Sequence, residues 1–280
     1  MEYITLNNGV KMPMAGIGTF LLSPDEAEAS CLSALGCGYR LIDTANAYVN
    51  EKAVGRAMKK SGLAREEIFL ETKLWPTFYT DENAVDDTLE RLGTDYIDLY
   101  LLHQAMKDYF SAWRAMEDAY SEGKLKAIGV SNFYPHVLTN FCEIVKVKPM
   151  VNQVELHPYY AQEKALETMA YYDVVPEAWA PLGGGRYNPF ENEMLKGIAE
   201  AHKKTVGQVI LRWNVQRGVV VIPKSTHRER IEENFNIWDF PLTEEEMKQI
   251  SSLDMGYVGT AVKHFDPEFV RMCNGRKIHD

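Results

Sequence analysis

Four residues capable of acid–base chemistry follow consecutive apolar runs of the sequence. Asp43 lies near the end of the run at 40–45, and Tyr48 comes five residues later; Lys73 ends the run at 68–74, and His103 ends the run at 96–103. Each one alone has a structural explanation, as a helix cap, a packed rim aromatic, a solvated strand end or a satisfied buried imidazole. Their placement on neighbouring units favours one shared site.

These residue types suit the protonation of a carbonyl oxygen. A carbonyl that accepts hydride develops negative charge on oxygen, so an acid must supply a proton. A free phenol has a pKa of ~10 and is a reluctant donor at neutral pH. A nearby ammonium stabilises the phenolate and strengthens the acid. We therefore expect Lys73, held charged by Asp43, to lower the pKa of Tyr48, and His103 to orient the substrate oxygen.

The elements that must position these residues follow a repeating pattern. Helical signals separate the apolar runs, among them a capping box at Ser23–Glu26, another at Thr243–Glu246 and an apolar stripe through Val85, Leu89 and Leu92. Near-continuous apolar runs are typical of parallel strands buried on both faces. The eight runs lie at 14–20, 40–45, 68–74, 96–103, 126–132, 150–156, 174–181 and 218–224.

Eight strand–helix repeats without a linker predict an α/β protein, a (β/α)8 TIM barrel that spans residues 1–280 as one domain. A hairpin with a two-residue turn at Asn8-Gly9 should precede the barrel. The aperiodic segment 254–280 should form a C-terminal tail over the active-site mouth. A doubly wound sheet is disfavoured, because Gly16-Ile17-Gly18 lacks the third glycine of a phosphate-binding turn and Gly183-Gly184-Gly185 comes too late.

Composition restricts the class of partner. The net charge of −10 and the pI near 5.3 argue against nucleic acid. No apolar segment approaches the ~20 residues of a membrane span, and the N-terminus lacks the pattern of a secretory signal. The four cysteines form no CxxC pair and are interpreted as reduced thiols. We therefore expect a cytoplasmic protein with no membrane partner.

A basic stretch after the last apolar run has the character of an anion site. Lys224-Ser225-Thr226-His227-Arg228-Glu229-Arg230 opens a helix, and Thr226 and Glu229 have capping-box spacing. Free N–H groups at a helix N-terminus, hydroxyls and cations together attract anions. Such runs are more often merely solvated. The position after the eighth strand, where barrels often bind phosphate, favours the anion site.

Along nearly its whole length the chain resembles the aldo-keto reductases. The matching stretches are GYRLIDTANAYVNEKAVGRAM, ETKLW, DYIDLYLLH, KAIGVSNF, NQVELHP and IPKSTHRERIEENF, and EAWAPLG is similar to the bacterial subgroup that includes 2,5-diketogluconate reductases. The resemblance implies NADPH-dependent reduction of aldehydes or ketones by a monomer, with NADP+ as the product. The implied catalytic residues are Asp43, Tyr48, Lys73 and His103, with Tyr48 as general acid.

The resemblance also implies a set of cofactor contacts. Ser131, Asn132 and Gln153 match positions that hold the nicotinamide carboxamide, and Trp179 matches the aromatic that stacks on its ring. Lys224, Ser225, Thr226 and Arg230 match the clamp for the adenosine 2′-phosphate, and Glu233 and Asn234 match adenine contacts. His227 departs from the arginine that is frequent there, which puts the strength of the NADPH preference in question. Further expected contacts are Gly18, Thr19, Phe20, Ala180, Pro181, Leu182 and Gly183.

Substrate residues depart further from the family's pattern. Phe20, Val49, Trp75 and Gln104 should line the substrate site, with Val49 and Gln104 standing where relatives often have a small residue and a tryptophan. Such an aromatic site suits small carbonyls, including dicarbonyls. No dedicated carboxylate clamp is evident, although Arg186 or Lys263 could reach the substrate.

Three other functions remain open at this level. Zinc-type catalysis by His103, Glu155 and His157 lacks a metal-binding spacing, and His157 before Pro158 is better interpreted as a turn residue, so we predict no metal. A non-catalytic NADPH-binding sensor or interaction subunit is disfavoured by the intact set of four catalytic residues. Physiological oxidation of an alcohol uses the same machinery in reverse.

Overall fold

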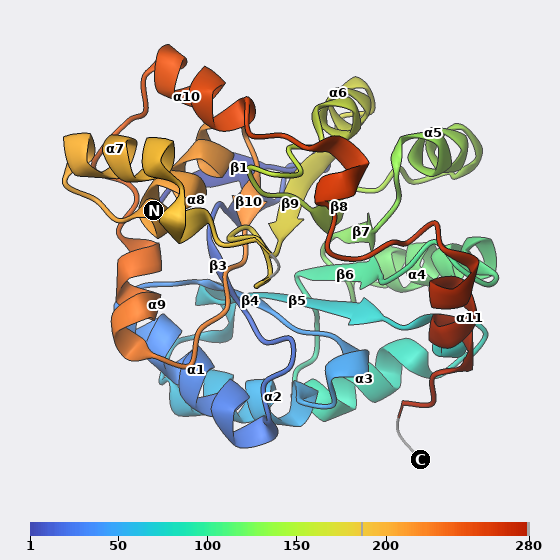
Figure 1. Cartoon of the computed structure of the whole chain (residues 1–280). Coiled ribbons are helices and arrows are strands. Elements are labelled where there is room, and N and C mark those ends of the chain that lie inside the picture. The colour runs from blue at the N-terminus through green and yellow to red at the C-terminus, as the bar shows by residue number, and fades with distance from the viewer. Residues whose placement is uncertain (186, 279–280) are drawn as a thin grey trace.

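A closed barrel of parallel strands forms the centre of the computed structural model, which describes residues 1–185 and 187–278. Each strand pairs in parallel with the next one along the chain, and the bridge between Ala15 and Val221 closes the ring. The predicted (β/α)8 barrel is thus confirmed (Figure 1). Its strands are β3 (Gly16–Gly18), β4 (Leu41–Asp43), β5 (Phe69–Leu74), β6 (Leu99–Leu102), β7 (Ile128–Ser131), β8 (Val151–Glu155), β9 (Val175–Trp179) and β10 (Val220–Val221).

Helices surround the strands because each carries one apolar face. The two predicted capping boxes are present, with Ser23 before α1 and Thr243 before α10, and Leu89 and Leu92 of α3 are buried. The helices are α1 (Pro24–Cys37), α2 (Glu51–Lys60), α3 (Ala84–Leu92), α4 (Tyr109–Ser121), α5 (Pro135–Ile144), α6 (Glu163–Tyr171), α7 (Glu193–His202), α8 (Val206–Gln216), α9 (Arg228–Phe235), α10 (Glu244–Ser251) and α11 (Pro267–Gly275).

The N-terminal hairpin has a different turn from the one predicted. β1 (Tyr3–Thr5) pairs antiparallel with β2 (Lys11–Pro13). Leu6 N–H donates to the carbonyl of Val10, and Gly9 N–H donates to the carbonyl of Leu6, so three residues form the loop. Gly9 takes the left-handed conformation that this loop requires at its last position. The hairpin is confirmed, but its two-residue turn was wrong because the strands close one residue earlier, before Asn7.

The C-terminal tail folds back over the edge of the barrel near the end of β5, as expected. Asp266 caps α11, and α11 lies against the short 3-10 helix η3 (Pro76–Phe78) that follows β5 (Figure 1). Cys273 and Ile278 of the tail form an apolar cluster with Ala47, Trp75 and Met106. The tail therefore borders the loops in which Tyr48 and Trp75 lie. Helix α11 itself was not predicted, because its sequence shows little periodicity.

Two general properties of the chain follow from this arrangement. None of the helices that the structure describes is long and apolar enough to cross a membrane. All four cysteines are free thiols, in line with the reduced state expected from their spacing.

Candidate active site

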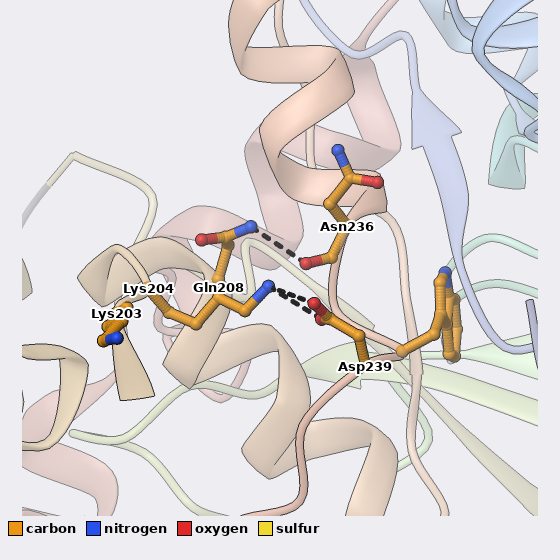
Figure 2. A pocket seen from close by; sticks show the side chains of 6 residues that line it. Lys203, Lys204, Gln208, Asn236 and Asp239 are labelled. Carbon is orange, nitrogen blue, oxygen red and sulfur yellow. Dashed lines mark hydrogen bonds and ion pairs between the residues drawn. The ribbon is translucent and has the colours of Figure 1, made fainter. Parts of the chain in front are cut away.

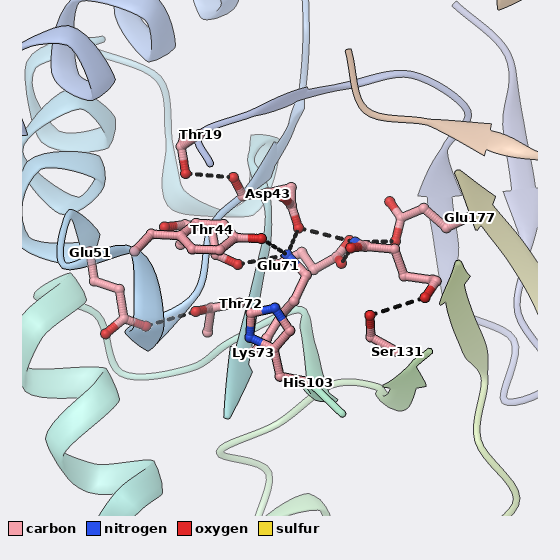
Figure 3. A network of polar contacts seen from close by, with 12 residues as sticks. Thr19, Asp43, Thr44, Glu51, Glu71, Thr72, Lys73, His103, Ser131 and Glu177 are labelled. Atoms are coloured by element: carbon pink, nitrogen blue, oxygen red, sulfur yellow. Dashed lines mark hydrogen bonds and ion pairs between the residues drawn. The ribbon is translucent and has the colours of Figure 1, made fainter. Parts of the chain in front are cut away.

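Lys73 is the fully buried centre of a charged network at the C-terminal end of the barrel. Its ammonium pairs with the carboxylate of Asp43, donates to the carbonyl of Thr44 at 2.9 Å, and donates to the hydroxyl of Tyr48 at 3.4 Å (Figure 3). Burial disfavours the charge of Lys73, but Asp43, Tyr48 and Glu71 together raise its pKa above the ordinary value. The lysine is therefore charged at every pH at which the fold is expected to be stable.

The loop after β4 places Tyr48 above this lysine. Tyr48 ends the 3-10 helix η1 (Asn46–Tyr48), and Val49 then turns the chain with φ of 59°. Asn50 fixes the loop, because its amide donates to the carbonyls of Thr19 and Leu22 and its oxygen accepts from Thr44. The position of the half-buried phenol is thus set by hydrogen bonds on both sides of η1.

The acidity of Tyr48 differs from the expectation. Burial raises its pKa to about 12; Lys73 lowers the pKa, while the charge of Asp43 raises it. The predicted net lowering was therefore wrong, because removal from water outweighs the neighbouring ammonium. Lys73 donates the hydrogen bond between the two groups, so the phenol keeps its own proton and can donate it elsewhere.

His103 follows β6 and meets Tyr48 from the opposite side. The two ring centroids are 5.7 Å apart, and the ring of Trp75 lies edge-on to His103 at 4.9 Å. Burial, followed by the charges of Lys73, His264 and Arg276, holds the pKa of His103 well below 6.5, so the imidazole is neutral. Its Nδ1 is buried and has no hydrogen-bond partner in the described part of the chain. A phenol and a neutral imidazole that lie side by side can both donate a hydrogen bond to the same oxygen atom of a ligand.

Three further polar residues, Glu71, Gln153 and Glu177, lie beside Asp43 and Lys73. We call these five residues the barrel-interior network. The amide nitrogen of Gln153 lies 3.1 Å from Asp43, 2.7 Å from Glu71 and 3.1 Å from Glu177 (Figure 3). All five are almost completely buried. Burial raises the pKa of Glu177 to about 7, with Asp43 adding to the effect, and raises that of Glu71 well above its ordinary value. Sequence reasoning missed both glutamates, although each interrupts an apolar run.

Two of the expected nicotinamide residues meet Trp179 at the ends of β7 and β9. Asn132 has φ of 61°, donates to the hydroxyl of Ser131 at 3.0 Å, and accepts from the indole N–H of Trp179 at 3.0 Å. Its amide also donates to the carbonyl of His103. Asn132 is thus bonded directly to the backbone of His103 and links Ser131 and Trp179 to it, whereas the amide nitrogen of Gln153 turns toward the interior carboxylates.

The other expected contacts near the nicotinamide lie in two loops. Thr19 is buried and donates from its backbone and hydroxyl to the carbonyl of Asp43, and the exposed ring of Phe20 lies 5.0 Å from that of Tyr48. A Cβ on Gly18 would come within 2.9 Å of the Ile222 carbonyl, so only glycine fits this approach to the chain after β10. The second loop is a turn after β9 formed by Ala180, Pro181, Leu182 and Gly183, closed by a bond from Gly183 N–H to Ala180.

The basic loop, residues 224–230, runs from the end of β10 into α9. His227, rather than Thr226, is the N-cap of α9, and no side chain caps the helix. The predicted Thr226–Glu229 capping box was wrong, because the helix begins later, at Arg228, and Ser225 instead accepts from His227 N–H at 3.1 Å. Ser225 is buried, whereas Lys224, Thr226, His227 and Arg230 are exposed. Neither Lys224 nor Arg230 forms an ion pair with a described carboxylate.

Glu233 and Asn234 lie in α9, on the side facing α8. Glu233 accepts from the hydroxyl of Thr205 at 2.7 Å, which ties α9 to the N-cap of α8, and Asn234 is buried. The structure thus brings the two expected adenine residues next to the basic loop but gives Glu233 a contact within the protein.

The expected substrate residues divide into exposed and buried members. Val49 and Phe20 are exposed, and Trp75 and Gln104 are buried. The indole nitrogen of Trp75 and the side-chain oxygen of Gln104 have no hydrogen-bond partner in the described residues. Of the two cations suggested for a carboxylate, Arg186 lies outside the described residues, and Lys263 lies in the tail next to the buried His264.

Glu155 and His157, two of the three residues considered for a metal site, make contacts within the protein. Glu155 accepts from His157 at 3.2 Å and from the tail through the hydroxyl of Thr260 and the backbone N–H groups of Ala261 and Val262. His157 and Tyr160 exchange two backbone hydrogen bonds, which confirms that His157 lies in a turn. Glu155 therefore fastens the C-terminal tail to the end of β8, and none of its contacts is to His103.

A separate hollow of about 490 Å³ lies between the start of α8 and the chain after α9 (Figure 2). Several of its polar groups are paired with one another: Lys204 donates to both carboxylate oxygens of Asp239, at 2.7 and 2.8 Å, and Gln208 donates to the carbonyl of Asn236. The indole nitrogen of Trp238 has no partner in the described residues. Its lining contains none of the four acid–base residues.

Comparison with known proteins gives a consistent result. A family profile described as the Aldo/keto reductase family matches residues 14–255. A glyoxal reductase of Bacillus subtilis is 46% identical over 258 residues, covering 90% of this chain and 93% of the relative. A methylglyoxal reductase, DkgA, of Escherichia coli K12 is 40% identical over 257 residues, covering 90% and 94%.

Solved structures agree in fold as well as sequence. An aldo-keto reductase of Bombyx mori, determined in complex with NADP, is 33% identical and superposes with a TM-score of 0.86, covering 90% of this chain and 92% of the other. One from Brucella melitensis is 43% identical with a TM-score of 0.87, covering 90% and 99%. The family expected from the sequence motifs is confirmed.

Proposed function

This chain belongs to the aldo/keto reductase family of NADPH-dependent oxidoreductases, and we propose that it reduces a small aldehyde or ketone to the alcohol with Tyr48 as general acid. The observation that carries the proposal is the hydrogen-bonded stack of Asp43, Lys73 and Tyr48, with neutral His103 on the far side of the phenol. The oxygen of a carbonyl between Tyr48 and His103 would meet one proton donor and one polarising group.

The chemistry of the site residues follows from their charges. NADPH, when bound, would supply the hydride that the carbonyl carbon accepts. Tyr48 gives its proton to the carbonyl oxygen, which becomes the hydroxyl of the alcohol, and the resulting phenolate lies next to the ammonium of Lys73. Asp43 keeps that ammonium charged and in place. His103 orients the oxygen through its neutral imidazole, which avoids placing a second cation against Lys73.

Residues that fit a phosphorylated dinucleotide surround these groups. Near His103, Ser131 offers a hydroxyl, Asn132 an amide and Trp179 an aromatic face. The basic loop adds exposed cations and the uncapped N-terminus of α9, which suit a phosphate. We assign the nicotinamide end to the first group and the 2′-phosphate to the second, and we infer a preference for NADPH over NADH. In support of this assignment, the Bombyx mori relative was determined in complex with NADP.

The substrate class rests on the aromatic surroundings of Tyr48. The rings of Phe20 and Trp75 flank the phenol and the imidazole. Relatives are described as glyoxal and methylglyoxal reductases, so dicarbonyls belong in the first substrate panel with aromatic aldehydes and keto-esters.

Loss of NADPH absorbance on adding each carbonyl tests the proposal. We expect turnover of several members of the panel by the unaltered protein. Tyr48→Phe should lower kcat by about 10²–10⁴-fold while leaving the Kd for NADPH, measured by fluorescence titration, within about twofold. Undiminished turnover by the variant would remove the proton-donor assignment. Absence of single-turnover NADPH oxidation in the unaltered protein would instead favour a non-catalytic, cofactor-binding role.

A further inference from the structure

Arg276 brings a positive charge to the rim of the proposed active site from the far end of the chain. It follows α11, and its guanidinium carbon lies 5.5 Å from the centre of the Trp75 ring. One of its nitrogens lies 3.4 Å from the carbonyl of Ala47, the residue before Tyr48. The side chain is therefore held over the two loops that carry Trp75 and Tyr48.

The charge of Arg276 has no carboxylate partner in the part of the chain that the structure describes. Arg65, Arg91 and Arg217, by contrast, each pair with an aspartate or glutamate at 2.6–2.7 Å. The tail, residues 254–280, contains four lysines and arginines and four acidic residues, so it carries no net charge in a chain of net charge −10. Arg276 is thus an exposed arginine without a described ion-pair partner, on a tail that is less acidic than the chain as a whole.

Trp75, which the guanidinium of Arg276 contacts, and the neighbouring His103 each carry a polar atom without a described partner. The indole nitrogen of Trp75 and the Nδ1 of His103 are both buried and have no hydrogen-bond partner in the described residues. Trp75 contacts both sides, since its ring lies 4.9 Å from that of His103 and 5.5 Å from the guanidinium. Unsatisfied buried polar groups are costly, and a ligand is one way in which proteins satisfy them. The field of Arg276 reaches His103 and contributes to the low pKa of that imidazole.

We propose that Arg276 binds a carboxylate of the substrate, so that the reductase favours aldehydes or ketones that carry a carboxylate a few bonds from the carbonyl. The inference rests on the proposed function, because Tyr48 and His103 must bind the other end of the molecule. A guanidinium matches a carboxylate with two parallel hydrogen bonds. The two residues that Arg276 contacts, Ala47 and Trp75, belong to an apolar cluster beside it.

A competing explanation gives Arg276 only a packing role, as a cation over Trp75 that anchors the tail. The two explanations differ in one measurable respect. A packing role affects all substrates alike, whereas a carboxylate contact affects only those with the anionic group.

The test compares kcat/KM for two matched pairs of substrates, 4-carboxybenzaldehyde with methyl 4-formylbenzoate and 4-oxobutanoate with its methyl ester. Arg276→Met removes the charge and keeps an unbranched apolar side chain over Trp75. The control is Lys277→Met, which removes the adjacent exposed cation. Thermal unfolding of each variant establishes that the tail remains docked.

We expect the unaltered protein to prefer the acid of at least one pair, with a preference that falls as salt rises. Arg276→Met should lower kcat/KM for that acid by about tenfold to a hundredfold and change the ester by less than twofold. Lys277→Met should leave the acid-to-ester ratio unchanged. Arg276→Lys should retain part of the preference, because it keeps the charge and loses the planar fork.

An acid-to-ester ratio that is the same in the unaltered protein and in Arg276→Met overturns the inference and leaves the proposed function intact. A failure of the unaltered protein to oxidise NADPH with acids, esters and methylglyoxal alike overturns the proposed function itself, and the role of Arg276 falls with it.

Discussion

The barrel-interior network and the basic loop are both rich in charged side chains, but they satisfy charge in opposite ways. Inside the barrel, Lys73 is fully buried and pairs with Asp43, and Gln153 links Asp43 to Glu71 and Glu177. In the basic loop, Lys224 and Arg230 are exposed and form no ion pair with a described carboxylate. The interior ammonium is paired within the protein, although one oxygen each of Glu71 and Glu177 has no partner in the described residues. In the basic loop only Arg228 pairs with a described carboxylate, that of Glu232.

The difference implies that the barrel-interior network serves mainly the folded state and the basic loop serves mainly ligand binding. Charges removed from water must be compensated inside the fold, so the interior network is held in place before any ligand arrives. Exposed charges cost little when unpaired, and they gain most from a ligand that is itself doubly charged, such as a phosphate. Substitutions in the interior should therefore change stability and chemistry together, and substitutions in the basic loop should change only cofactor affinity.

Lys73→Met should produce the largest effect. We expect kcat to fall by about 10²–10⁴-fold and the free energy of unfolding to fall by about 3–5 kcal/mol, because Asp43 is left buried without its counter-charge. The matched change Lys224→Met should alter the free energy of unfolding by no more than ~0.5 kcal/mol. Urea denaturation and steady-state kinetics measure both quantities. Equal destabilisation by the two variants would remove the distinction between the regions.

Glu177→Gln should change how stability depends on pH. The pKa of Glu177 is raised to about 7 by burial and by Asp43, so between the unfolded value of 4.5 and about 7 the native carboxyl keeps a proton that the unfolded chain releases. The free energy of unfolding of the unaltered protein therefore falls as pH rises through this window, by roughly 3 kcal/mol from this group. Glu71 contributes in the same direction, because its pKa is also raised.

The variant should accordingly gain stability relative to the unaltered protein from pH 5 to pH 8, as measured by urea midpoints at a series of pH values. Glu233→Gln in α9, beside the basic loop, is the control and should show no such gain. A pH dependence that is unchanged in Glu177→Gln would mean that the interior carboxylates are not the groups that bind the proton.

The sequence predicted the barrel and the four acid–base residues for one physical reason. Parallel strands buried on both faces read as apolar runs, and polar residues at their C-terminal ends converge on one rim. Lys73 and His103 could be found in this way without knowledge of any distance. The turn at Asn8-Gly9 and the start of α9 were misplaced by one or two residues. Local signals such as capping-box spacing do not fix the residue at which a turn closes or a helix begins.

The remaining features depend on contacts between distant segments. Glu71 and Glu177 were visible as charges within apolar runs, but their meeting through Gln153 follows from barrel closure and register. The sign of the pKa shift of Tyr48 depends on how much water is removed, which residue types do not reveal. Arg276 lies in an aperiodic tail, and its approach to Trp75 is a tertiary contact across some two hundred residues.

Arg230→Met should test the basic loop directly. We expect KM for NADPH to rise by about tenfold and KM for NADH to change by less than twofold, because the contact proposed for Arg230 is a charge-assisted bond to the 2′-phosphate, which NADH lacks. The free energy of unfolding should not change, since the side chain is exposed and has no ion-pair partner in the described chain. A matched rise in KM for both cofactors would place Arg230 near the part that they share.

His227→Arg should give the smallest effect and sharpen the same distinction. His227 is the exposed N-cap of α9 and follows the buried Ser225, whose hydroxyl accepts from its N–H. An arginine here adds a fixed cation that can stack on adenine and approach the 2′-phosphate, which is worth about 1 kcal/mol at an exposed position. We expect the ratio of kcat/KM for NADPH to that for NADH to rise about threefold to fivefold, with most of the gain removed by high salt. His227→Gln, which stays uncharged, should leave the ratio within about twofold. A comparable gain in both variants would show that the backbone around the N-cap, rather than the charge of the side chain, governs cofactor choice in this loop.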